Sequence, residues 1–136
     1  MAFRARLGQE GLEGIFLATG RGLIALVGSG DARADGDSWR SFAPPTFAGR
    51  GVVFRAEGVG GAGAGLYRVA LGRHATPGAV PPTLEQLSLV GQPTPLGGTF
   101  VAFGVPSGSR GRAVAFTADL LSARAASAVL LQATAP

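Results

Sequence analysis

The chain begins with an alternation of apolar and charged side chains. Phe3, Ala5 and Leu7 are apolar, and the two residues between them are arginines. Successive side chains of an extended strand point to opposite faces, so this pattern predicts a strand with one buried and one wetter face. Residues 116–120 alternate in the same way and predict a second strand of this kind.

These strand-like segments recur along the chain. A Phe-x-Ala unit occurs three times, at separations of 51 and then 62 residues, as Phe3-Arg-Ala5, Phe54-Arg-Ala56 and Phe116-Thr-Ala118. A second apolar segment follows each Phe after 12, 12 and 13 residues, around Ile15, Leu66 and Val129. Recurrence of neighbouring segments in step predicts an internally repeated β architecture.

Two further segments complete one cycle. Leu23–Gly28 is similar to Leu87–Gly91, and each precedes two aromatic residues spaced three apart and then a proline. The residues that recur once per cycle are predicted to hold the repeats together, because repeated positions usually form the core of such proteins. This predicted repeat core comprises Phe3, Ile15, Val27, Trp39, Phe42, Phe54, Leu66, Val90, Phe100, Phe103, Phe116 and Val129.

One cycle thus contains four short strands over about fifty residues, joined by glycine-rich turns, which is typical of a propeller blade. We expect an all-β fold of four-stranded antiparallel, propeller-blade-like repeats, in one domain over residues 1–136 with repeats of about 1–51, 52–112 and a partial 113–136. Strands are expected in groups of three, four and three, or about two and a half blades. A β-sandwich or an open barrel is the alternative, because closed propellers have about four to eight blades.

Two stretches depart from the cycle. The extra residues of the second cycle fall mostly between Ala70 and Leu84, where several prolines predict an inserted loop. Residues 122–133 are rich in Ala and Leu, which favours a helix. The repeat register instead favours a turn and then a strand from about Ala128, and we predict the strand, since pairing overrides propensity in short segments.

Composition narrows the function classes. The chain has 136 residues, 12 basic and 8 acidic side chains and a net charge of +4, and its 23 Gly and 9 Pro fit many tight turns. All basic residues are arginines and they are scattered, so no nucleic-acid partner is expected. There is no cysteine, hence no disulfide framework, and no run that predicts an export signal or a membrane span.

These segments resemble a known family. Phe-Arg-Ala, Gly14-Ile-Phe-Leu, the run from Leu23 to Asp31, and Gly98-Thr-Phe-Val-Ala-Phe103 are similar to the units of bacterial tandem-repeat proteins described as NxxGxxAF-containing, of the choice-of-anchor type. The resemblance implies propeller-like β repeats and a secreted or cell-surface location, and it gives no biochemical activity to carry over to this chain. The sequence departs from the motif because it contains no Asn.

One loop could hold a metal ion. Asp31, Asp35 and Asp37 place three carboxylates around Gly36, and calcium prefers such oxygen ligands. The spacing does not match an EF-hand loop, and the matching segment near Gln92 has no acids. We therefore expect a solvated turn and no cofactor, with calcium as the alternative.

No catalytic constellation is recognisable. His74 is the single histidine and lies in the proline-rich insertion without an acid or nucleophile at a familiar spacing. The serines at 107, 109 and 122 are isolated, and the glycine-rich stretch 60–65 lacks the Lys and helix of a phosphate-binding loop. The paired aromatics could stack on a sugar or a base, but their recurrence favours core packing.

The sequence therefore predicts a non-catalytic structural or interaction module, part of a larger or oligomeric assembly. Incomplete blades leave unpaired strand edges that a second copy, or missing blades of a longer chain, would cover. The alternative is a calcium-dependent or carbohydrate-binding repeat protein.

Overall fold

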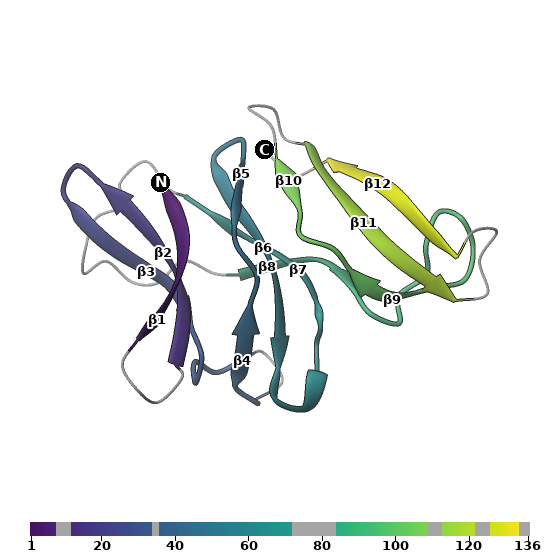
Figure 1. The fold of residues 1–136 in the computed structure, drawn as a ribbon, viewed down its shortest axis with the longest axis horizontal. Helices are drawn as coiled ribbons and strands as arrows, with labels where there is room; N and C mark the ends of the chain where they lie inside the picture. The colour runs from purple at the N-terminus through teal and green to yellow at the C-terminus, as the bar shows by residue number, and fades with distance from the viewer. Residues whose placement is uncertain (8–11, 34–35, 72–83, 109–112, 122–125, 134–136) are drawn as a thin grey trace.

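The computed structural model describes residues 1–7, 12–33, 36–71, 84–108, 113–121 and 126–133. Within these ranges all regular structure is β, apart from one 3-10 turn at Val59–Gly61. The strands form three separate antiparallel sheets, none closed on itself, which follow one another across the molecule in chain order (Figure 1). The predicted all-β class is confirmed.

The N-terminal sheet is a simple meander with the order β1-β2-β3. Its strands are β1 (Ala2–Leu7), β2 (Leu12–Thr19) and β3 (Gly22–Gly28). Phe3 pairs with Phe16, and the register of β2 on β3 shifts between Ile15 and Phe16. Such a β-bulge places two residues of one strand opposite one of the other.

The central sheet has the order β4-β6-β7-β8, and β5 also pairs with β6. Its strands are β4 (Trp39–Phe42), β5 (Thr46–Ala48), β6 (Gly51–Gly58), β7 (Gly65–Ala70) and β8 (Leu84–Leu89). β4 and β5 form one outer strand interrupted at Pro44 and Pro45, because proline has no N–H to donate to a ladder.

The C-terminal sheet has the order β10-β11-β12, and β9 also pairs with β11. Its strands are β9 (Thr99–Phe103), β10 (Ser107–Gly108), β11 (Ala113–Leu121) and β12 (Ser127–Ala133). β9 and β10 again form one outer strand interrupted at a proline, Pro106. β12 confirms the strand predicted from about Ala128, while residues 122–125 lie outside the described ranges.

The pairing assigns corresponding positions in the three sheets. Phe3 pairs with Phe16, Phe54 with Tyr67, and Phe116 with Leu130. The bulge between Ile15 and Phe16 corresponds to the bulge between Leu66 and Tyr67. The three predicted Phe-x-Ala strands, β1, β6 and β11, therefore pair in the same way with the strand that follows them, although β1 is an edge strand and β6 and β11 are interior strands.

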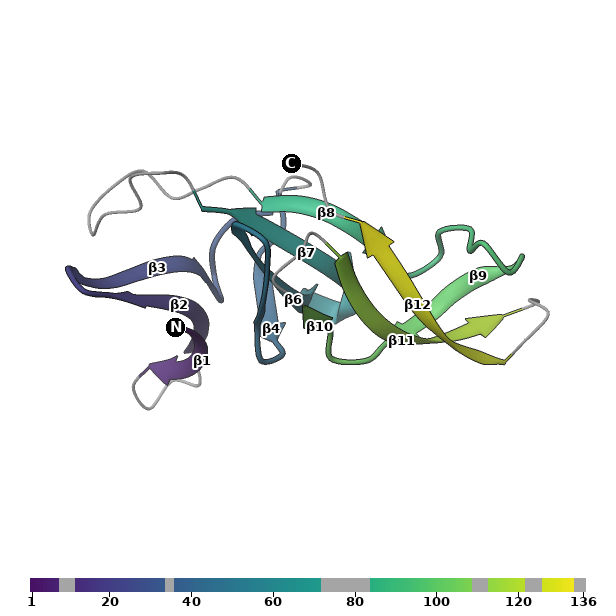
Figure 2. The ribbon, with the colours of Figure 1, turned by 90° about the horizontal axis from the view of Figure 1, so that it is seen from above.

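The core lies between successive sheets. One cluster joins the facing sides of the N-terminal and central sheets, with Ile15, Trp39, Phe42 and Phe54 among its members. A second joins the central and C-terminal sheets around Leu66, Phe100, Phe103 and Phe116. The view from above shows the sheets stacked in a row, the central one between the other two (Figure 2). The central sheet is thus covered on both faces, and each outer sheet on one.

Most of the predicted repeat core is buried, but three positions differ. Val90 is 42% exposed because it lies just beyond the end of β8, and Val129 is 77% exposed on the outer face of β12. Phe3 is only partly buried, on the outer face of β1. The predicted core positions that are buried are Ile15, Val27, Trp39, Phe42, Phe54, Leu66, Phe100, Phe103 and Phe116.

The error at Val90 comes from the predicted match of Leu23–Gly28 with Leu87–Gly91. In the sheets, Gly28 pairs with Gly14 and Leu89 pairs with Gly65, so Leu89 corresponds to Gly28. The residue that corresponds to Val27 is consequently Ser88, which is buried. The similarity of the apolar residues thus predicts a register two residues away from the one in which the strands pair.

Candidate functional site

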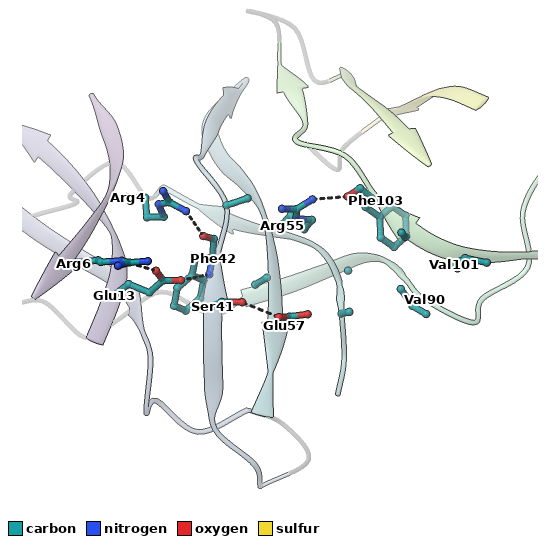
Figure 3. A pocket seen from close by; sticks show the side chains of 15 residues that line it. Arg4, Arg6, Glu13, Ser41, Phe42, Arg55, Glu57, Val90, Val101 and Phe103 are labelled. Carbon is teal, nitrogen blue, oxygen red and sulfur yellow. Dashed lines mark hydrogen bonds and ion pairs between the residues drawn. The ribbon is translucent and has the colours of Figure 1, made fainter. Parts of the chain in front are cut away.

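A groove spans the two sheet junctions and is lined mainly by residues of β1, β4, β6 and β9. We call it the inter-sheet groove; its volume is about 430 Å³. Side chains from all three sheets line it (Figure 3). The polar lining residues are Arg4, Arg6, Glu13, Ser41, Arg55 and Glu57. The apolar and glycine lining residues are Phe42, Ala43, Ala56, Ala64, Gly65, Val90, Val101, Ala102 and Phe103.

Two arginines of the groove make the same contact across two different sheet junctions. Arg4 on β1 donates from Nη1 to the carbonyl oxygen of Phe42 on β4, at 3.1 Å. Arg55 on β6 donates from Nη1 to the carbonyl oxygen of Phe103 on β9, at 2.7 Å. Arg4 and Arg55 hold corresponding positions, opposite Ile15 and Leu66 respectively. Each junction is therefore bridged by an arginine of one sheet that reaches the outer strand of the next.

Glu13 adds a buried contact at the first junction. Its side chain is 9% exposed, and its Oε1 accepts a hydrogen bond from the backbone N–H of Phe42 at 2.6 Å. Arg6 Nε lies 3.9 Å from the other carboxylate oxygen, but the Arg6 side chain is 77% exposed, so solvent screens this pair. The main role of Glu13 is to satisfy a buried donor of β4.

The remaining polar pair of the groove lies within the central sheet. Ser41 Oγ donates to Glu57 Oε1 at 3.0 Å, and the two residues are direct cross-strand neighbours. Nucleophilic catalysis by serine needs a general base and donors for the developing oxyanion. Among the described lining residues there is no histidine, and the Ser41 hydroxyl is held by a cross-strand carboxylate. The polar side chains that line the groove thus contact one another or backbone groups of the chain itself.

The predicted calcium loop is described in part. Asp31 Oδ2 accepts a hydrogen bond from the backbone N–H of Gly28 at 2.8 Å, so its carboxylate closes its own turn. Gln92 Oε1 accepts from the backbone N–H of Leu89 at 2.9 Å, at the corresponding place of the central sheet. Asp37 is exposed, and Asp35 lies outside the described residues. Over the part of the chain that is described, no three His, Cys, Asp or Glu side chains gather closely enough to hold a metal ion.

The structure places some of the candidate catalytic residues and both aromatic pairs that the sequence suggested. His74 and the serines at 109 and 122 lie in undescribed stretches, and Ser107 is exposed on β10. The paired aromatics are buried, with ring centroids 6.0 Å apart for Trp39 and Phe42 and 4.9 Å apart for Phe100 and Phe103. They form core, not a stacking surface.

The glycine-rich stretch before β7 packs closely around an arginine. A Cβ atom at Gly63 would overlap the guanidinium group of Arg33, and one at Gly58 would overlap it too. The Arg33 guanidinium carbon lies 5.2 Å from the centroid of the Trp39 ring, within reach of a cation–π contact. These glycines make room for a side chain of the protein itself.

Sequence reasoning did not find the inter-sheet groove. Its signal was present, because Arg4 and Arg55 are the middle residues of two Phe-Arg-Ala units. The recurrence by itself predicts only the wetter face of a strand, and the stacking of the sheets shows which carbonyl groups the arginines reach.

Comparisons place no further limit on the function. None of the described residues forms a helix of the length and apolarity required to traverse a bilayer. Comparison of the chain with protein-family models, with curated proteins and with solved structures finds no match.

Proposed function

We propose that this chain is a non-catalytic structural or interaction module whose three sheets are propeller-type repeats, and that its role is to assemble. The observation that carries the proposal is the repeated junction. Arg4 and Arg55 make the same hydrogen bond to the next sheet, and an aromatic pair fills the core beside each bond. In repeat proteins each unit packs on its neighbours, and a continuous core results.

The strand order supports the same proposal. The central sheet has the order expected of a four-stranded blade, if β4 and β5 count as one interrupted strand. The other two sheets contain subsets of that order, with bulges at corresponding positions. A common pattern of pairing, interruption and bulging supports descent of the sheets from one repeating unit.

Measurement of the mass in solution tests the assembly role. Light scattering on a sizing column is expected to give a discrete species larger than the 13.6 kDa chain. A monomer across the micromolar range would overturn assembly as the role of the module.

Calcium-dependent binding is tested separately by thermal melting with and without a chelator. A ligand that binds only the folded state must raise its stability. Because Asp31 already closes its own turn, we expect EDTA to leave the melting temperature unchanged. A fall of several degrees, restored by added calcium, would favour the calcium-dependent alternative.

A further inference from the structure

The outer face of the C-terminal sheet exposes apolar side chains at positions that are buried elsewhere. Val129 pairs with Thr117, as Leu66 pairs with Arg55 and Ile15 with Arg4. Leu66 and Ile15 are fully buried beneath the next sheet, whereas Val129 is 77% exposed and Leu131 is 75% exposed. The C-terminal sheet therefore presents the side that, in the other two sheets, receives a neighbour.

The outer face of the N-terminal sheet has the complementary property. Phe3 and Phe16 stack there with ring centroids 5.8 Å apart, and both are only partly buried. The corresponding pair in the central sheet, Phe54 and Tyr67, is buried by the preceding sheet. Phe3 and Phe16 thus present the side that, in the later sheets, packs on a predecessor.

We propose that a second copy of this chain covers both faces, head to tail. The Val129–Leu131 face of each copy packs on the Phe3–Phe16 face of the other, which closes a symmetric ring of two chains. This inference rests on the proposed assembly function and names its partner and surface. It continues the face-to-face stacking that the chain already makes twice within itself. The arginine bridge is not repeated in it, because Thr117 holds the place of Arg4 and Arg55 and, among the described residues, no outer strand precedes β1.

The number of sheets favours two copies. A head-to-tail contact yields a ring if its rotation closes and a filament if it does not. Propellers close with about four to eight blades. The described residues of one chain form three sheets, so two chains give a ring of six, within that range, whereas three chains would exceed it.

Packing through faces agrees better with the structure than pairing through the free edge of β12. Gly14 on β2 and Gly65 on β7 each lie opposite the next strand of their sheet, β3 and β8 respectively. A Cβ atom at Gly14 would lie 2.8 Å from the carbonyl oxygen of Val27, and one at Gly65 would collide with the carbonyl oxygen of Ser88. The corresponding residue of β12 is Ala128, opposite Ala118. A strand added to β12 in the same register would meet its methyl group.

The test uses charge reversal of the apolar faces on the full chain. One variant carries Val129→Arg with Leu131→Arg, and the other carries Phe3→Arg. Val59→Arg is the matched control, because Val59 is 60% exposed and lies in the 3-10 turn between β6 and β7 of the central sheet, which contributes to neither outer face. Each variant is first checked for an unchanged urea transition of Trp39 fluorescence at a concentration where wild type is monomeric.

We expect wild type and the control to show twice the mass of one chain, and each face variant to lose the dimer at the same concentration. An equimolar mixture of the two face variants should regain dimer, because one junction of the mixed pair has both faces intact. Tail-to-tail pairing would instead make Phe3→Arg harmless, which overturns the proposal. A wild-type dimer that both face variants leave intact overturns the ring but keeps the assembly function, and a wild-type monomer overturns both.

Discussion

Replacement of Phe54 by alanine tests whether the first junction holds the fold together. Phe54 is fully buried on β6, and its ring meets that of Phe42 edge-on, with centroids 6.0 Å apart. The substitution removes the buried ring, leaves a cavity and loses the edge-to-face contact. Phe→Ala changes in cores cost about 3–5 kcal/mol, and we expect the upper half of that range because packed sheets on both sides of β6 restrict collapse.

This loss should leave a folded but weakened protein. Domains of this size unfold with a free energy of about 5–15 kcal/mol. With a urea dependence of about 2 kcal/mol per molar, the expected loss lowers the transition midpoint by about 2 M. Trp39 is a convenient probe, since it is the single tryptophan, is 6% exposed and belongs to the same core cluster.

The matched control is Phe47→Ala in the same sheet. Phe47 is 41% exposed on β5, so the same chemical change removes far less buried surface and should cost about 1 kcal/mol or less. The measurement is urea unfolding of both variants, followed by Trp39 fluorescence. If Phe54→Ala loses no more than Phe47→Ala, the junction between the N-terminal and central sheets does not form as described.

Three further changes probe the polar contacts and the close approaches. Glu13→Ala leaves the buried N–H of Phe42 without its acceptor and should cost about 1–3 kcal/mol in urea unfolding, whereas Glu13→Gln, which keeps an oxygen acceptor, should retain most of the stability. Gly65→Ala places a methyl group against the Ser88 carbonyl and should lower the melting temperature. Gly20→Ala is the control and should leave the melting temperature unchanged, because nothing lies near a Cβ atom at that position. Equal effects of the two substitutions would contradict the tight pairing of β7 and β8. Arg55→Ala removes the hydrogen bond to the Phe103 carbonyl and should lower the free energy of unfolding by about 1 kcal/mol. Arg40→Ala, at an exposed position on β4, is the control. Equal urea midpoints for the two variants would exclude a stabilising role for the Arg55 bridge.

Local alternation made the strands predictable, because a period of two survives in every sheet. The Phe-x-Ala strands and the strand after Ala128 follow from short segments. Burial depended on more distant information. Val129 and Leu66 are both aliphatic. Leu66 is buried because the C-terminal sheet packs on it, whereas Val129 lies on an outer face and is exposed.

The strand register and the inter-sheet groove could not be predicted either, because both depend on contacts between segments that are distant in the sequence. The match that placed Val90 in the core rested on similar apolar residues in the two segments, whereas the backbone pairing of β3 with β2 and of β8 with β7 sets the register two residues away. The inter-sheet groove combines residues from three sheets, and its bridges end on backbone carbonyls of Phe42 and Phe103. Every residue carries a backbone carbonyl group, so the residue type does not show which carbonyl groups accept these hydrogen bonds.

Because the central sheet is covered on both faces, we expect its strands to be the last to unfold locally. Amide hydrogens exchange with solvent when their segment opens, and the segments with the most buried contacts open last. β6 and β7 are covered on both faces, whereas β1 and β12 are edge strands of sheets that are covered on one face. Deuterium uptake should therefore advance from the two ends toward the middle, and the slowest amides should belong to residues 52–54 and 66–69.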